Sequence, residues 1–183
     1  RRPRAEQAID PSFYDAEALD LINNDCRSGL TGVLATAFKG IWISSPEGTA
    51  RVSDKILQLA VARSCGFRVP DTLVTQQRQE VVEFYEGHHR KIIVKTLAGA
   101  NKSFLLTRFV QEPHAIDEAA FKVCPALYQE YIPGSHHIRL NCFGTRSYAA
   151  LIESDELDWR PNLNIPIRSW AVPDELHSRV RSV

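Results

Sequence analysis

Two lysines and an arginine stand at positions where a polyphosphate could be bound. Lys95 ends the apolar run 91–95, Lys55 lies near the start of a helix pattern, and Arg139 lies in a later strand pattern. Polyphosphate binding requires several cations that converge from different elements, and an exposed strand edge such as that of 126–132 can recognise a purine. On residue types alone, a nucleotide site and solvated lysines beside an ordinary core strand both explain this pattern.

The histidines and cysteines show no metal-binding pattern, so we expect no metal ligand in this sequence. His88 and His89 lie in a polar turn, whereas His136 and His137 lie on an extended segment, where neighbouring side chains point in opposite directions. There is no Cys-x-x-Cys pair and no Cys/His ligand spacing. The sequence favours buried thiols in a reducing compartment over disulfides at the four cysteines, Cys26, Cys65, Cys124 and Cys142.

Periodicity and turn residues predict the elements that would position these side chains. Helices are predicted at 12–38, from an N-cap at Ser53 to a stop at Gly66, at 77–85, at 114–123 and at 173–183. Strands are predicted at 40–44, 72–75, 91–95, 103–110, 126–132, 138–143 and 147–153. A turn is predicted at 45–48, a mobile hairpin tip at 96–102 and irregular backbone at 155–169. This alternation of helix and strand predicts an α/β layer.

Composition is that of an ordinary globular domain and excludes some classes of function. Of the 183 residues, 44% are apolar and 24% are charged. There is no long uncharged apolar run, so we expect no membrane span. Lys plus Arg and Asp plus Glu number 22 each, which argues against a broad basic face for nucleic acid. The helix pattern 173–183 has no C-terminal cap, so we expect the sequence to be a piece of a longer protein.

Four stretches of the sequence occur in an order that is typical of one enzyme family. They are 53–72, 91–97, 127–133 together with 138–140, and Leu157-Asp-Trp-Arg160. With them the sequence resembles the ATP-grasp family, and most of all its peptide maturases that form lactones and lactams in microviridin-type peptides. The resemblance implies a partial α/β ATP-grasp fold. Its expected parts are the end of a pre-ATP-grasp domain at 1–50, a central subdomain at 51–127, and the hinge strand and start of the C-terminal subdomain at 128–183.

The resemblance also assigns roles to particular residues. Lys55 and Lys95 match the two lysines that contact nucleotide phosphates in such enzymes. The hinge that binds adenine matches Gln129, Glu130, Tyr131 and Ile132. In that hinge, a carboxylate or carbonyl accepts a hydrogen bond from the exocyclic amine, and a main-chain donor faces the ring. Arg139 and Arg160 match arginines of the catalytic site.

Three positions depart from the family pattern. The acid that holds the ribose hydroxyls is replaced by His137, whose imidazole can still bond a hydroxyl. The loop after Lys95 carries a single glycine, Gly99, where the family loop that covers the phosphates is often richer in glycine. The family's metal-binding Asp and Glu-x-Asn have no counterpart in residues 1–183. We therefore expect the Mg²⁺ ligands beyond residue 183 and the 183-residue segment alone to be inactive.

The implied function is an ATP-dependent ligase with ATP and Mg²⁺ as its cofactors. It would activate a carboxylate as an acyl phosphate for attack by an amine or hydroxyl, on side chains of a ribosomally made precursor peptide. Two alternatives stay open: a glutamate-adding or glutathione-synthetase-like ligase, and a non-catalytic nucleotide- or peptide-binding remnant. The expected partner is a peptide and not nucleic acid or a membrane, a homodimer is left open, and the expected compartment is the cytoplasm.

Overall fold

The structure, a computed structural model, describes residues 10–99, 105–162 and 164–181. The chain divides into two compact units, Arg1–Pro46 and Glu47–Val183. Among the described residues, no helix has both the length and the apolar composition that a membrane crossing requires. The predicted hairpin tip at 96–102 lies partly outside the described residues.

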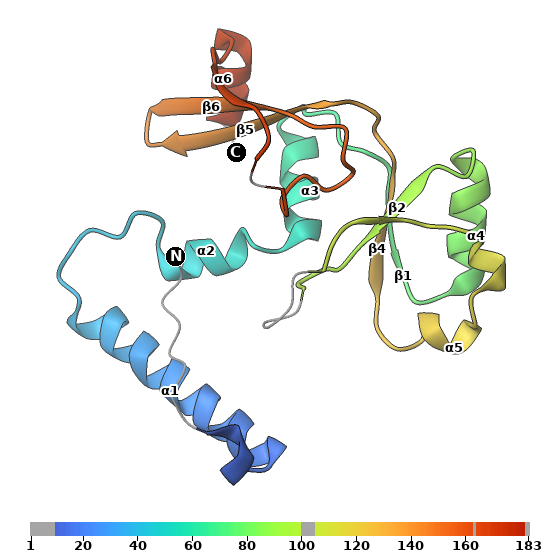
Figure 1. The fold of residues 1–183 in the computed structure, drawn as a ribbon. Coiled ribbons are helices and arrows are strands. Elements are labelled where there is room, and N and C mark those ends of the chain that lie inside the picture. The colour runs from blue at the N-terminus through green and yellow to red at the C-terminus, as the bar shows by residue number, and fades with distance from the viewer. Residues whose placement is uncertain (1–9, 100–104, 163, 182–183) are drawn as a thin grey trace. The chain divides into compact units, whose positions relative to one another are not determined.

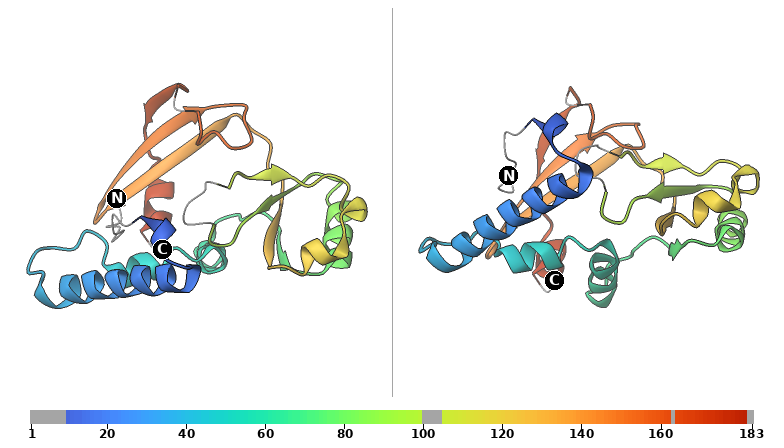
Figure 2. Two further views of the ribbon diagram at one scale, coloured as in Figure 1. Left: turned by 60° about the horizontal axis from the view of Figure 1, so that its bottom comes forward. Right: turned by 90° about the horizontal axis from the view of Figure 1, so that it is seen from below.

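The first unit consists mainly of one long helix. A 3-10 turn, η1 (Pro11–Phe13), precedes α1 (Ala16–Ala37), which Figure 2 shows as an uninterrupted helix. The helix predicted at 12–38 is confirmed, and it starts at Ala16 because the side chain of Asp15 accepts a hydrogen bond from the N–H of Ala18, at 2.8 Å. No residue of α1 is buried within the described part of the chain.

The strand predicted at 40–44 is wrong. No described strand pairs with this segment, and the side chains of Ile41 and Ile43 are 90% and 81% exposed. An apolar run becomes a strand only when a neighbour supplies the ladder of hydrogen bonds, which is lacking here among the described residues. The turn predicted at 45–48 is also wrong, because Pro46 takes the first position of a short helix, α2 (Pro46–Arg51).

The first helix that lies wholly within the second unit carries Lys55 as its first residue. This helix, α3 (Lys55–Ser64), is capped by Asp54 and not by Ser53 as predicted. The carboxylate of Asp54 accepts from the N–H groups of the second and third helical residues at 2.8 and 3.0 Å, whereas the hydroxyl of Ser53 donates to the carbonyl of Thr49 at 2.6 Å. Gly66 has a φ of +77° just beyond the helix, which confirms the predicted stop.

A four-stranded antiparallel sheet forms the centre of the second unit. Its order is β1-β4-β2-β3, with β1 at Thr72–Thr75, β4 at Ala126–Glu130, β2 at Ile92–Lys95 and β3 at Arg108–Phe109. The helices α4 (Arg78–Gly87) and α5 (Glu118–Phe121) pack on one face of this sheet (Figure 1). The core between them contains Val81, Ile92, Val110, Phe121 and Tyr128.

Two predicted elements beside this sheet are shorter than expected. The helix predicted at 114–123 is divided into a 3-10 turn, η2 (Pro113–Ala115), and α5, because the side chain of Asp117 starts a new helix by accepting from the N–H of Ala119. The strand predicted at 103–110 is reduced, within the described residues, to the two residues of β3.

Alternation along the strands decides which side chains face away from the helices. On β2, Ile92 and Val94 contact the core, so Ile93 and Lys95 point to the opposite face. On β4, Tyr128 belongs to the core in the same way, and Gln129 lies on the opposite face. The face without helices therefore carries Lys95 and Gln129 from neighbouring strands.

A second, three-stranded antiparallel sheet follows the hinge. It has the order β5-β6-β7, with β5 at His136–Phe143, β6 at Arg146–Glu153 and β7 at Ile167–Trp170. The predicted hairpin is confirmed, and Gly144 takes a φ of +57° in its turn. The irregular backbone predicted at 155–169 is wrong at its end, where pairing with β6 makes β7 a strand. The last helix is α6 (Asp174–Val180), and Nδ1 of His177 lies 3.0 Å from Oγ of Ser147 on β6.

The cysteines are less buried than predicted. All four lie in the described part of the chain, and none of them is in a disulfide. Cys26 and Cys65 are half-buried, while Cys124 and Cys142 are exposed. Cys142 lies on β5, which is an edge strand of its sheet, and Cys124 precedes Pro125 in the turn that leads to β4.

Candidate functional site

A cavity of about 800 Å³ lies on the face of the first sheet that the helices leave open. Its walls come from β2 and β4, from the start of α3, from the residues after β4, and from the loop between β6 and β7. A cavity of this size accommodates a molecule as large as a nucleotide. The residues that line it include Lys55, Lys95, Gln129, His137, Trp159 and Arg160.

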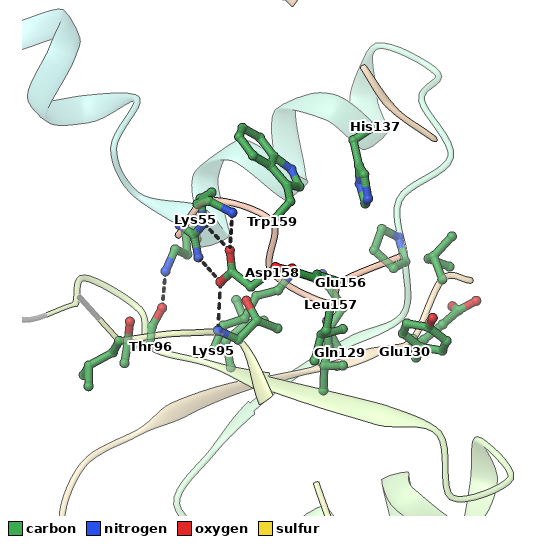
Figure 3. A pocket seen from close by; sticks show the side chains of 18 of the residues that line it. Lys55, Lys95, Thr96, Gln129, Glu130, His137, Glu156, Leu157, Asp158 and Trp159 are labelled. Atoms are coloured by element: carbon green, nitrogen blue, oxygen red, sulfur yellow. Dashed lines mark hydrogen bonds and ion pairs between the residues drawn. The ribbon is translucent and has the colours of Figure 1, made fainter. Parts of the chain in front are cut away.

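Lys95 and Lys55 meet in this cavity although they come from different elements (Figure 3). The ammonium of Lys95 donates to Oε1 of Gln129 at 2.7 Å, and that of Lys55 donates to the main-chain carbonyl of Thr96. Burial lowers the pKa of Lys95, and the positive charges of Lys55 and Arg160 lower it further, while Asp158 opposes this effect. Burial, followed by the charge of Arg160, also lowers the pKa of Lys55.

Asp158 holds the third cation of the cavity in place. Its carboxylate accepts a hydrogen bond from Nε of Arg160 at 2.6 Å, a second one from Nη2, and one from the main-chain N–H of Thr107 at 3.0 Å. The side chain of Asp158 is only 7% exposed. Its bonds to Arg160, together with that from Thr107, hold the pKa of this carboxyl well below its ordinary value, although burial works against them.

The balance of charge around Lys95 suits an anion. The charges that act on Lys95 are the cations Lys55 and Arg160 and the carboxylate Asp158, so with Lys95 itself the group carries a formal charge of +2. Because Asp158 is already bonded to Arg160 and Thr107, the two lysines keep donor capacity for a ligand. The arrangement can therefore bind a polyanion such as a nucleotide phosphate group.

In the hinge after β4, the main chain is available to a ligand, whereas the carboxylate of Glu130 is not. Oε2 of Glu130 accepts from the N–H of Asp71 at 2.9 Å, and Figure 3 shows the Glu130 side chain pointing away from the lysines. The ring of Tyr131 stacks edge-on against Phe109, with centroids 4.9 Å apart. Ile132 lines the cavity, and no hydrogen bond to another described residue uses its main-chain N–H. A purine could therefore be recognised here by backbone groups.

Of the predicted site residues, the structure brings all but one into the cavity. His137 lines it, and its Nε2 donates to the carbonyl of Ser154 at 3.3 Å. Arg139 is exposed on β5 and does not line the cavity. It follows His137 on the same face of the strand, but two residues of extended chain carry it about 7 Å further along. The residues gathered in the cavity are Lys55, Lys95, Gln129, Glu130, Tyr131, Ile132, His137 and Arg160.

Several residues of the site were missed by sequence reasoning. Asp158 lies in the stretch that matched the family, two positions before Arg160, and that spacing was a usable signal for an ion pair. Trp159 lies between them and lines the cavity. Thr107 takes part only through its main chain, for which the sequence gives no signal.

A second cluster of polar side chains lies behind the hinge. Ligand atoms of Asp71, His88 and Glu130 lie within 4.8 Å of one another, and such donors can hold a divalent cation. Each of them already has a partner in the chain: Nε2 of His88 lies 3.3 Å from Oδ2 of Asp71, and its Nδ1 lies 2.8 Å from the carbonyl of Phe84. No local pattern in the sequence indicates this cluster, because Asp71 and Glu130 are 59 positions apart.

The structure is similar to solved structures of ATP-grasp enzymes. The macrocyclase MdnC of Microcystis aeruginosa, bound to its precursor peptide MdnA, is 22% identical, with a TM-score of 0.76 over 94% of this chain and 56% of that one. An ATP-grasp ligase of Chryseobacterium gregarium, in complex with ADP and a leader and core peptide, is 23% identical, with a TM-score of 0.77 over 93% and 55%. The ATP-grasp ligase PsnB, complexed with a variant of its minimal precursor, Mg and ADP, is 22% identical, with a TM-score of 0.76 over 97% and 57%.

These similarities concern the fold. No protein-family model matches the chain, and no curated protein matches it. The chain spans 55–57% of the length of the three solved structures. The partial α/β ATP-grasp fold expected from the sequence is confirmed, and so is the likeness to the peptide-maturing enzymes within that fold. The described residues therefore have the ATP-grasp fold over the part that they share with these enzymes.

Proposed function

We propose that the intact protein is an ATP-dependent ligase that acts on side chains of a precursor peptide. The observation that carries this proposal is the convergence of Lys55, Lys95 and Arg160 in one cavity beside an open hinge. It is supported by the fold, because structural neighbours were solved with precursor peptides and two of them with ADP. In this proposal a side-chain carboxylate is activated as an acyl phosphate and then attacked by an amine or a hydroxyl.

Each residue of the cavity has a role in binding and orientation. Lys55 and Lys95 hold the phosphates, and Arg160 adds a third positive charge that neutralises negative charge on a transferring phosphoryl group. The main chain around Ile132 binds the adenine. His137 can offer its remaining ring nitrogen to a ribose hydroxyl. Arg139 lies outside the cavity, so its role in catalysis stays a prediction.

The carboxylate of Asp158, which lies beside the three cations, does not by itself fit a hydrated Mg²⁺ ion. It already accepts from Arg160 and from the N–H of Thr107. A magnesium ion requires near-octahedral oxygen ligands and usually keeps several waters beside one or two carboxylates. The roles proposed for the described residues are therefore those of fixed cations and main-chain donors, and the Mg²⁺ ligands are expected elsewhere in the intact protein.

Calorimetric titration with ADP and mass spectrometry of a candidate precursor peptide with ATP test the proposal. We expect one ADP to bind per chain, and the peptide to lose one water for each bond formed. The Lys55→Ala variant should weaken ADP binding about tenfold or more, the effect of losing a charge-assisted contact. The matched control is Lys122→Ala, since Lys122 is 67% exposed and pairs with Glu118 on α5.

The outcomes separate the competing functions. A protein that binds no ADP contradicts the proposal. ADP binding without any ligation supports a non-catalytic nucleotide-binding remnant. ATP-dependent ligation of free glutamate or cysteine in place of a peptide supports a ligase of the glutamate-adding or glutathione-synthesising kind.

A further inference from the structure

We propose that Thr72 and Gln129 are a positioning pair that fixes the direction of the Gln129 amide, so that Lys95 is presented to the bound anion as an uncompensated cation. This inference rests on the proposed function, in which Lys95 binds a nucleotide phosphate. Neither residue needs to touch the nucleotide for this role. The pair acts through Lys95.

The pair is created by the order of the strands. Because β4 lies between β1 and β2, Gln129 has Thr72 directly opposite it on one side and Lys95 diagonally opposite on the other. Oε1 of Gln129 accepts from the Lys95 ammonium at 2.7 Å, and its Nε2 donates to the hydroxyl of Thr72 at 2.9 Å. That hydroxyl donates in turn to the main-chain carbonyl of Pro70 at 2.9 Å.

This chain of hydrogen bonds has only one consistent direction. The carbonyl of Pro70 can only accept, so the hydroxyl of Thr72 uses its single proton there and must accept from Gln129. A flipped amide would place its NH₂ group against the ammonium and its oxygen against the lone pairs of the hydroxyl. Gln129 is only 6% exposed, so water cannot easily replace a lost partner. The amide oxygen therefore points at Lys95.

The side-chain amide of Gln129 is neutral, so it leaves the positive charge of Lys95 available to an anion. Lys95 is faced by Lys55 of α3 and by Arg160 and Asp158 of the loop between β6 and β7, whereas its partner within the sheet, Gln129, does not titrate. The amide oxygen stabilises the protonated amine against burial and the two cations without cancelling its charge. A carboxylate at position 129 would hold the ammonium more strongly, but it would leave less positive charge for a phosphate.

Three substitutions in the intact protein test the pair with two measurements. The pKa of Lys95 is obtained from the pH profile of amine labelling followed by mass spectrometry, and the affinity for ADP is obtained by calorimetry. Thr72→Val keeps the shape and strand preference but frees the amide to rotate, so both the pKa and the affinity should fall, the affinity about tenfold. Thr72→Ser restores the hydroxyl and should restore both values. Gln129→Glu should raise the pKa and still weaken ADP about tenfold.

The matched control is Thr75→Val. Thr75 lies on the same strand, but its hydroxyl donates to Glu80 and not to Gln129, so this variant should change neither the pKa of Lys95 nor the ADP affinity. A folded Thr72→Val protein with both values unchanged overturns the proposal, as does a Gln129→Glu protein with unweakened ADP binding. If the wild-type protein binds no ADP, the proposed function fails, and the labelling profiles of Thr72→Val and Thr75→Val alone decide whether the pair positions Lys95.

Discussion

Burial and two neighbouring cations disfavour the positive charge of Lys95, and this makes the free energy of unfolding depend on pH. Its pKa in the folded chain is lower than the ordinary 10.5, so between these two values the unfolded chain binds more protons. The free energy of unfolding therefore rises with pH across that window, and below it Lys95 lowers stability. A bound anion favours the protonated form of Lys95, so anion binding and protonation of Lys95 stabilise each other.

Removal of the Lys95 side chain should affect binding more than folding. In the intact protein, Lys95→Ala is expected to weaken ADP binding by about 1–3 kcal/mol, the range of a charge-assisted hydrogen bond. The fold should survive, because the side chain points into the cavity and not into the core. Calorimetric titration of both proteins beside their thermal melts is the measurement. Unchanged affinity would remove Lys95 from the site, and a collapsed melt would show that it serves the structure.

At the scale of elements, two short segments bring cations into the cavity. The helix α3 places Lys55 at its first position because Asp54 caps it. The loop between β6 and β7 places Arg160 because Asp158 ties this loop to the N–H of Thr107 before β3. In both cases one aspartate sets the position of the cation that follows it within two residues.

Loss of the cap on α3 should lower stability and loosen Lys55. Asp54→Ala removes the acceptor for two main-chain N–H groups and is expected to cost about 1 kcal/mol in the free energy of unfolding. Asp54→Asn retains a capping oxygen and should cost much less. Urea unfolding of the three proteins measures both effects. Equal stability of the alanine variant and the wild type would show that Ser53 or the main chain can begin the helix unaided.

Loss of the Asp158 charge should lower stability in a pH-dependent way. Asp158→Asn is expected to cost on the order of 2 kcal/mol at pH 7, because it weakens hydrogen bonds to a charged partner. Since the folded pKa lies below the ordinary 3.8, the stabilisation is complete above that value and is lost as pH falls through the folded pKa. The difference between wild type and variant should therefore shrink below about pH 3.8 in urea unfolding.

The matched control for this variant is Asp174→Asn, because Asp174 is exposed at the start of α6. It is expected to change the free energy of unfolding by less than about 0.5 kcal/mol. A pH-independent difference between Asp158→Asn and the wild type would contradict the assignment of the ion pair.

At the scale of the whole molecule, the net charge bears on the attraction of a ligand, and the connection between the two units bears on protease access. The chain is formally neutral, with 22 basic and 22 acidic residues, so long-range attraction of an anionic ligand is weak and the cation cluster must act locally.

The two compact units are joined near Pro46, and the residues before it contain the exposed Ile41 and Ile43. A segment without a ladder partner among the described residues is open to proteases.

Limited trypsin digestion should cut first after Lys39 among the sites in the described residues. Lys39 lies between the end of α1 and α2, in a segment that belongs to no helix or strand. Mass spectrometry of the earliest fragments identifies the cut, and Lys39→Gln should abolish it while leaving later cuts in place. Early cleavage after Lys91, which directly precedes β2, or after Lys95, which is the last residue of β2, would contradict this division of the chain.

The sequence by itself determined the features that depend on near neighbours. Apolar runs predicted the strands around Ile92 and Leu127, and Gly66 and Gly144 lie where a helix stop and a hairpin turn were predicted. These strand, helix-end and turn features depend on backbone preference and spacing within a few residues, which a single sequence displays directly. The two lysines were assigned to a nucleotide site by the family resemblance, because residue types alone left solvated lysines equally open, and both line the cavity.

Only the tertiary structure decided which distant residues meet. The insertion of β4 between β1 and β2 brings Thr72 to Gln129 across 57 positions, and the loop after β6 brings Asp158 to Thr107 across 51. Pairing with β6 likewise made β7 a strand. The apolar segment around Ile41 has no pairing strand among the described residues. Pairing between distant segments depends on the closure of long loops and on the register of whole sheets, and no local pattern in the sequence records either.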